Sequence, residues 1–133
     1  MIQEILKLYL DLKQHVPVEM WSNHRASGVR KLGIIHARLR HNCSVLNYDL
    51  FRCNLVGDPS CMCGNPCENI FHFFTECPLY MQARDTLYKN NDTAVTGNVN
   101  LNTFLYGNPA VSLDDNNIIF RAVQRYIRES GRF

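Results

Sequence analysis

The stretch "CMCGNPCENIFHFFTECPLY" (residues 61–80) decides what kind of fold this chain has, because it concentrates four cysteines and one histidine. Cys61 and Cys63 flank one residue, eight residues then lead to His72, and four more lead to Cys77. Three thiolates and one imidazole form a standard tetrahedral ligand set for structural zinc. Four protein ligands leave no position for a catalytic water, so the spacing predicts a closed Cys3His site.

The residues beside these ligands predict how the chain brings them together. Gly64 permits the positive-φ turn that lets two thiolates converge. His72 and Cys77 would lie about 140° apart on an unbroken α-helix, but a residue that precedes proline, here Pro78, is pushed out of the helical region. We therefore expect a helix that begins near Glu68 and ends at about Cys77, which frees the thiol to turn toward His72. The apolar residues expected to dock this helix are Ile70, Phe71, Phe73 and Phe74.

The other cysteines leave alternatives open. Cys67 either replaces one of the four ligands or fills space as a small buried hydrophobe. Cys43 and Cys53 have no partner at ligand spacing, and we expect them in the core. The total of six also allows a disulfide framework, but a chain without a secretory signal more commonly keeps its thiols reduced. The C-x-C pair is tighter than the spacing usual in zinc fingers.

The bulk composition is that of an ordinary globular protein of one domain. The chain has 133 residues, of which 46% are hydrophobic and 20% are charged. Its formal net charge of +2 permits an anionic partner without demanding one. Charged residues interrupt the start of the chain, so we expect no signal peptide, and no apolar run approaches the roughly 18 residues of a membrane span. We expect an intracellular protein, nuclear or cytoplasmic, with no membrane partner.

Apolar residues recur at three-residue and four-residue steps, and almost no segment alternates with period two. We therefore expect an all-α fold, a small helical domain with one structural zinc site. The expected parts of this single domain (1–133) are an N-terminal helix (1–16), a basic helical region (27–60), the zinc knuckle (61–80) and C-terminal helices (78–133). The last helix has the clearest limits, because Ser112 and Asp115 form a capping signature and Gly131 follows the final turn.

Two helices are expected within the basic helical region. The first runs from about Ser27 to His41, and its expected inner face consists of Leu32, Ile35, His36 and Leu39. The second is short and lies within residues 44–55. Its residues expected to point inward are Leu46, Leu50 and Phe51.

Two groups of basic residues suggest a binding surface. Four arginines on the last helix step by four, three and four residues, so they share one narrow sector opposite an apolar face. Such a stripe predicts salt-sensitive, sequence-independent binding to phosphates, and the alternative is a solvated face near a helix C-terminus. Aromatic residues nearby either stack on bases or pack in the core. The candidate nucleic-acid-binding residues are Arg30, Lys31, Arg38, Arg40, Arg121, Arg125, Arg128 and Arg132, and the aromatics are Trp21, Tyr48 and Tyr80.

The sequence lacks a recognisable set of catalytic carboxylates. A polymerase needs aspartates that hold Mg²⁺, but the Asp114–Asp115 pair follows Ser112 at a helix start, where it suits a cap and the helix dipole. No endonuclease or RNase H set of acidic residues can be assembled either. We expect this chain alone to catalyse no reaction.

The segment "RLRHNCSVLNYDLFRCNLVGDPSCMCGNPCENIFHFFTECPLYMQAR" (38–84) resembles the C-terminal, post-polymerase region of the reverse transcriptases encoded by non-LTR retrotransposons. The shared order is an R-L-R helix, an L-N helix, C-x-C-G, a polar spacer and H-x-x-x-x-C-P, and the resemblance covers roughly residues 35–90. It implies a zinc-binding knuckle that assists nucleic-acid handling during target-primed reverse transcription, within a larger reverse transcriptase. The ligands that it implies are Cys61, Cys63, His72 and Cys77. Where the family often has Glu and Thr in the spacer, this chain has Cys67, Glu68 and Asn69.

Two functions follow as hypotheses. The first is a non-catalytic zinc-binding tail of a retrotransposon-type reverse transcriptase, which binds RNA or DNA weakly and without sequence preference. The second is a zinc-stabilised protein–protein interaction module with no nucleic-acid role, whose arginine stripe meets an acidic partner. Affinity for nucleic acid that falls steeply with salt separates the two.

Overall fold

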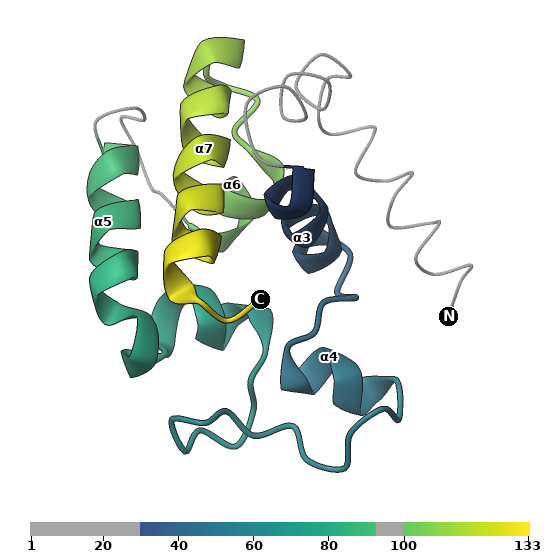
Figure 1. Cartoon of the computed structure of the whole chain (residues 1–133). Helices are drawn as coiled ribbons and strands as arrows, with labels where there is room; N and C mark the ends of the chain where they lie inside the picture. The colour runs from purple at the N-terminus through teal and green to yellow at the C-terminus, as the bar shows by residue number, and fades with distance from the viewer. Residues whose placement is uncertain (1–29, 93–99) are drawn as a thin grey trace.

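The computed structural model describes residues 30–92 and 100–133, which form a set of packed helices (Figure 1). In chain order the elements are α3 (Arg30–Arg40), α4 (Asn47–Arg52), the π-helix η1 (His72–Glu76), the 3₁₀ turn η2 (Pro78–Tyr80), α5 (Met81–Asp92), α6 (Leu101–Tyr106) and α7 (Leu113–Ser130). No strand occurs among the described residues, so the predicted all-α class is confirmed. The helix expected at 1–16 and the aromatic Trp21 lie outside them.

The long helix α7 organises the domain. It packs against α3, α5 and α6, and it lies between α5 and α3 in Figure 1. At its start the Ser112 hydroxyl oxygen accepts a hydrogen bond of 3.1 Å from the Asp115 N–H. At its end Gly131 takes the left-handed conformation, with φ of 65°. Both predicted limits of this helix are confirmed, and both satisfy backbone groups that a helix end leaves unpaired.

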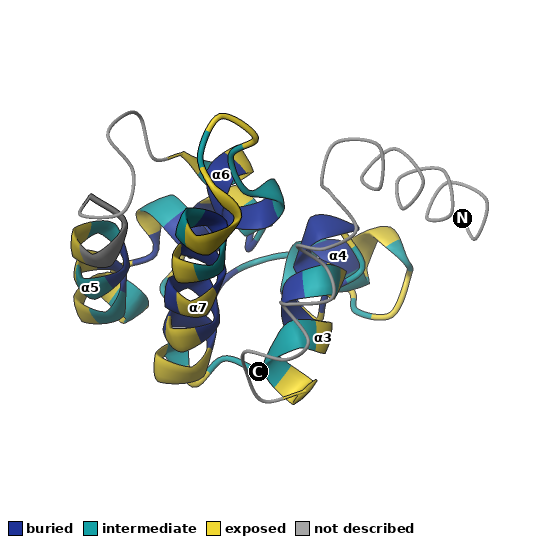
Figure 2. Cartoon of the chain, turned by 90° about the horizontal axis from the view of Figure 1, so that it is seen from above, coloured by how far each residue is buried: buried dark blue, intermediate teal, exposed yellow. Residues whose placement is uncertain are grey.

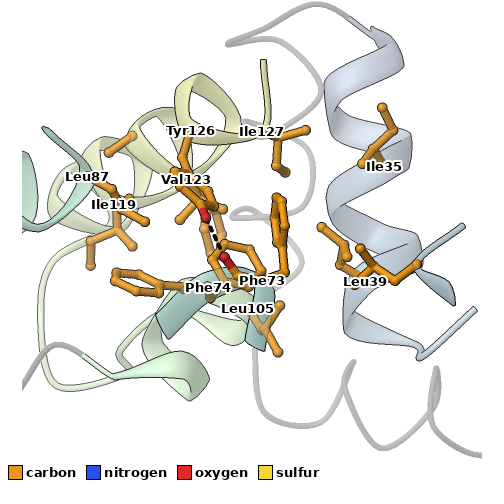
Figure 3. Packing of buried hydrophobic residues seen from close by; sticks show 14 residues of the cluster. Ile35, Leu39, Phe73, Phe74, Leu87, Leu105, Ile119, Val123, Tyr126 and Ile127 are labelled. Carbon is orange, nitrogen blue, oxygen red and sulfur yellow. Dashed lines mark hydrogen bonds between the residues drawn. The ribbon is translucent and has the colours of Figure 1, made fainter. Parts of the chain in front are cut away.

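The hydrophobic core lies along the inner face of α7 (Figure 2). Side chains with no exposed surface include Leu39, Leu46, Phe73, Phe74, Phe104, Ile119 and Val123. Figure 3 shows Phe73 and Phe74 beside Tyr126, whose hydroxyl donates a hydrogen bond to the Phe73 carbonyl. The Phe73 and Tyr126 ring centroids lie 5.0 Å apart. The segment between the third and fourth predicted ligands therefore supplies the centre of the core.

The predicted inner face of α3 is confirmed. Ile35, His36 and Leu39 are buried, and Leu32 is partly buried against the core. The Nε2 atom of His36 lies 2.8 Å from the Phe104 carbonyl oxygen. That contact joins α3 to α6, which also pack against each other.

Two aromatic residues that were expected to point inward do not. Phe51 is 42% exposed and Phe71 is 52% exposed. The short helix α4 is anchored by Leu46, the fully buried residue that precedes it, so Phe51 near its far end faces outward. The turn that buries Phe73 and Phe74 leaves Phe71 on the opposite side. None of the described helices is both long enough and apolar enough to cross a membrane.

Candidate metal centre

Four side chains from the knuckle segment (61–80) bring their donor atoms together. The Sγ atoms of Cys61, Cys63 and Cys77 and one nitrogen of His72 all lie within 4.8 Å of one another. The Cys61 and Cys77 sulfurs are 3.8 Å apart, and the Cys63 sulfur is 3.3 Å from His72 Nε2. The predicted Cys3His group is therefore confirmed as a cluster that could hold a metal ion.

Two of the donor–donor distances match those of a tetrahedral site. A metal about 2.3 Å from sulfur and about 2.0–2.1 Å from nitrogen separates two sulfurs by about 3.8 Å, and sulfur from nitrogen by about 3.5 Å. The Cys61–Cys77 pair has the first separation, and the Cys63–His72 pair is within 0.2 Å of the second, at 3.3 Å. These two pairs are thus already at the separations that a bound cation requires, and all four donor atoms lie within 4.8 Å.

A tight turn presents the first two thiols. The Gly64 N–H donates a hydrogen bond of 3.0 Å to the Cys61 carbonyl, and the Cys61 N–H donates one of 2.8 Å to the Asn65 carbonyl. Gly64 has a φ of 100°, a conformation that side-chain-bearing residues rarely adopt. The predicted role of this glycine is confirmed, and the turn places Cys61 and Cys63 on one side of the loop.

A π-turn presents the other two ligands. The Cys77 N–H donates a hydrogen bond of 2.9 Å to the His72 carbonyl, which closes an i→i+5 turn instead of the usual i→i+4 turn. Cys77 itself is extended, with ψ of 121°, as expected for a residue before Pro78. The α-helix expected from about Glu68 is instead a shorter helix, with π geometry over His72–Glu76. The wider turn brings side chains five positions apart onto the same face.

Burial of the thiols favours their neutral form until a cation is present. Cys61 and Cys77 are buried, and burial raises the pKa of the Cys61 thiol to about 12. Burial also raises the pKa of Cys77. A hydrogen bond with the backbone of Asn65 instead lowers the pKa of the half-buried Cys63. A bound cation reverses the effect of burial, because it stabilises each thiolate directly.

A buried carboxylate that the sequence analysis did not single out lies beside the cluster. Glu68 is 3% exposed, and its Oε2 atom lies 3.8 Å from the Cys61 sulfur. Arg132 binds both oxygens, at 2.7 Å through Nη2 and 2.9 Å through Nε. The Asn47 N–H donates a further hydrogen bond of 2.7 Å to Oε1. Burial alone raises the pKa of Glu68, but the hydrogen bonds from Arg132 and Asn47 outweigh it, so the pKa is lowered.

The remaining cysteines stand apart from the cluster. All six cysteines are free, so no disulfide framework forms among them. Cys67 is half-buried, and its N–H donates a hydrogen bond of 3.0 Å to Asn65 Oδ1. It does not belong to the four-residue donor group. Cys43 and Cys53 are also half-buried, so the expectation that they are core residues is wrong.

The structure separates the predicted basic residues into exposed and internal ones. Six are exposed at the surface: Arg30, Lys31, Arg38, Arg121, Arg125 and Arg128. Arg40 is 1% exposed, its Nε–H donates to the Leu105 carbonyl, and its guanidinium lies 5.7 Å from the centre of the Phe120 ring. Burial lowers the pKa of Arg40 to about 9. Arg132 follows the end of α7, so it is not part of a helical stripe, and it pairs with Glu68.

A signal for the position of Arg40 was present in the sequence. Arg40 follows His36 by four residues and directly follows Leu39, so it borders the inner face of α3.

Of the predicted stacking aromatics, Tyr48 and Tyr80 are half-buried. The Tyr80 ring packs against Phe73 at 5.3 Å between centroids.

The carboxylates of α7 occupy the positions expected for a helix cap. Asp114 and Asp115 lie in the first turn. Within residues 30–92 and 100–133, the Cys3His group is the one cluster of three or more histidine, cysteine or acidic residues arranged to hold a metal.

Comparison with protein-family models, with curated proteins and with solved structures found no match for this chain.

Proposed function

We propose that Cys61, Cys63, His72 and Cys77 hold one zinc ion that stabilises the fold. The observation that carries this proposal is the convergence of the four donor atoms within 4.8 Å. Three thiolates and an imidazole suit zinc better than magnesium or calcium, which prefer oxygen ligands. With four protein ligands the ion has no open position, so its contribution is to folding rather than to catalysis.

Metal analysis of the purified protein tests the zinc site. We expect one zinc ion per chain in the wild type and in Cys67→Ser, and loss of the zinc in Cys77→Ser. Cys67→Ser is the matched control, because it removes a half-buried thiol of the same loop that lies outside the donor group. A folded, reduced wild-type protein without metal would overturn the assignment.

We further propose that the zinc-stabilised domain binds RNA or DNA through its phosphates, weakly and without sequence preference. The support is the distribution of cations: Arg30, Lys31 and Arg38 are exposed on α3, and Arg121, Arg125 and Arg128 are exposed on α7. The two helices pack against each other, so the two sets belong to one body. Arg125 pairs with Glu129 at 2.7 Å, and none of the other five forms an ion pair within the described residues.

The salt dependence of binding tests this role. Each phosphate contact changes the slope of log affinity against log salt by about 0.7 for a single strand. Replacing Arg121, Arg125 and Arg128 together by glutamine should therefore reduce the slope by about 2. The variant should keep its zinc, because these side chains are exposed and lie outside the metal cluster. Failure of both RNA and DNA to bind at low salt would remove the proposal.

We also propose that the domain is one part of a larger protein. The order of motifs from residue 38 to residue 84 supports a non-catalytic tail of a retrotransposon-type reverse transcriptase, with the rest of that polyprotein as a partner. Thiolate ligands suit a reducing compartment, which supports a nuclear or cytoplasmic location. The test is to delete residues 61–80 from the full polyprotein. Target-primed synthesis should fall while extension of a preformed primer is retained.

A second function is favoured by a separate surface. An open hollow of about 610 Å³ follows directly after Cys77, and its lining mixes apolar residues such as Leu79 and Met81 with the polar residues Gln82, Thr86 and Glu129. These two side chains are 55% and 54% exposed. Such a surface, held in shape by the neighbouring zinc centre, suits the binding of a protein partner. If Leu79→Asp abolishes capture of a polyprotein partner while nucleic-acid binding is absent from the wild type, this second function replaces the first.

A further inference from the structure

We propose that a small cavity between α3 and Phe133 receives one unpaired base of a single-stranded RNA or DNA, while Lys31 and Arg38 hold the neighbouring phosphates. The inference rests on the proposed nucleic-acid binding and names the form of nucleic acid that the domain prefers. The cavity has a volume of about 190 Å³. The residues that line it are Lys31, Ile35, Arg38, Ser44, Val45 and Phe133.

The helix geometry aligns the cations with an apolar floor. Lys31, Ile35 and Arg38 occupy positions i, i+4 and i+7 of α3, so they lie on one face. Over this interval the helix rises about 10 Å, so the two cations stand on either side of Ile35. Ile35 is 9% exposed, whereas Lys31 and Arg38 are exposed. Neither cation forms an ion pair within the described residues.

The opposite wall is fixed by contacts within the protein. The Arg132 Nη2 donates a hydrogen bond of 2.9 Å to the Val45 carbonyl. The guanidinium of Arg132 lies 5.8 Å from the centre of the Phe133 ring, and that ring meets Phe73 edge-on at 5.4 Å. Because Arg132 is itself held by the buried Glu68, the aromatic wall is tied to the core before any ligand arrives.

The chemistry of the cavity fits a neutral base flanked by phosphates better than a free anion. Its floor and wall are apolar, its rim carries two cations, and none of its six lining residues is acidic. A volume of about 190 Å³ is below the roughly 300–1,000 Å³ of sites for drug-sized ligands, which suits one planar ring. The lone hydroxyl, on Ser44, already donates to Asp49 Oδ2 at 2.6 Å. Because Lys31 and Arg38 are engaged with phosphates in this proposal and the Ser44 hydroxyl is already bonded, no lining side chain selects a base edge, so the cavity should accept any base.

This arrangement predicts a preference for single strands. A base that enters the cavity must leave its stack, which costs little in a single strand and much in a duplex. The cations, in contrast, attract the phosphates of both forms. Entry of a base therefore adds affinity for the single strand alone, by about fivefold or more for one stacked base.

A pair of matched tryptophan variants tests the inference. Val45→Trp should fill the cavity, whereas Ile34→Trp places the same side chain on a residue of α3 that does not line it. The two positions are 43% and 42% exposed. The probes are a fluorescent oligouridylate and an RNA duplex of the same length. Val45→Trp should weaken oligouridylate binding by about fivefold or more and leave duplex binding unchanged, and Ile34→Trp should change neither.

A second variant covers the case in which Val45→Trp fails to retain its zinc. Lys31→Gln with Arg38→Gln keeps the cavity but should reduce the salt slope for oligouridylate by about 1.4, at about 0.7 per contact. Equal loss of single-strand and duplex affinity in Val45→Trp, or an unchanged slope in the double variant, would overturn the cavity assignment. If wild-type protein binds neither probe at low salt, the proposed nucleic-acid function fails together with it. If it binds both probes and only these variants lack the expected effect, the cavity alone is rejected.

Discussion

The carboxylate of Glu68 and the guanidinium of Arg132 face each other in a two-pronged contact, with Nη2 2.7 Å from Oε1 and Nε 2.9 Å from Oε2. The two residues are 64 positions apart in the chain. Glu68 belongs to the knuckle segment, and Arg132 follows Gly131, the residue that caps the end of α7. This ion pair thus fastens the last segment of the domain to the loop that carries the metal ligands.

We expect Arg132→Gln to destabilise the domain by about 2 kcal/mol. Removing one partner of a fully buried pair costs about 3–5 kcal/mol, and the 22% exposure of the Arg132 side chain reduces that cost. Urea unfolding of the zinc-loaded protein measures the loss. Arg125→Gln is the control, because its ion pair with Glu129 is exposed and should contribute less than about 1 kcal/mol. Equal stability of both variants would show that the buried pair contributes no more than the exposed pair.

Replacing Gly64 by alanine should cost about 1–2 kcal/mol of stability and weaken metal binding. No atom lies within 4 Å of the added Cβ, so the cost arises from the φ of 100° alone. Gly57→Ala is the matched control, because its Cβ also meets nothing within 4 Å and its φ is not in the left-handed region. Competition with a chromogenic chelator compares the two. Identical metal affinities would contradict a conformational role for Gly64.

The Tyr126 hydroxyl should contribute about 1–2 kcal/mol to stability. It donates to the Phe73 carbonyl inside the core, so Tyr126→Phe leaves a buried acceptor without its partner. Tyr48→Phe serves as the control, because Tyr48 is half-buried on the short helix α4. Thermal unfolding should place the melting temperature of Tyr126→Phe several degrees below that of Tyr48→Phe. A melting temperature equal to that of the control would show that this hydrogen bond does not stabilise the core.

Metal removal should loosen the core as well as the knuckle. Phe73 and Phe74 directly follow the ligand His72, and both are fully buried. Without a cation the four donor groups have no common partner, so the turn that aims these rings should loosen. Near-ultraviolet circular dichroism, which follows aromatic packing, should weaken on adding a strong chelator and recover on adding zinc. A spectrum that stays constant after complete removal of metal would show that the core holds the turn alone.

Local features of the structure were predictable from the sequence where short-range chemistry determines them. Spacing indicated a Cys3His site but left Cys67 as an alternative ligand, and the resemblance to the reverse transcriptase region implied the four donor residues. The role of Gly64 followed from the tight turn, and the extended backbone of Cys77 followed from the proline after it. The limits of α7 follow from Ser112 and Gly131, because caps are set by neighbouring residues.

Features that depend on distant segments were not predictable in the same way. Glu68 gives no local sign of its partner, and Arg132 repeats the helical spacing of the exposed arginines although the helix has already ended. Phe71 and Phe73 are both aromatic and close in sequence, but only the packing of α7 decides which one is buried. The π-turn was also not predictable from the sequence, because the same amino-acid pattern allows either i→i+4 or i→i+5 hydrogen bonds at a helix end.

The i→i+5 turn between His72 and Cys77 fixes the length of the segment that joins them. Deleting one of the four intervening residues would return the turn to ordinary helical pitch and leave the proline one position early. An inserted residue would carry the thiol past the site. The same segment carries the buried Phe73 and Phe74, which both pack against Tyr126 of α7, so the metal centre and the core impose the same length requirement. In any related chain, this segment should vary in composition far more readily than in number of residues.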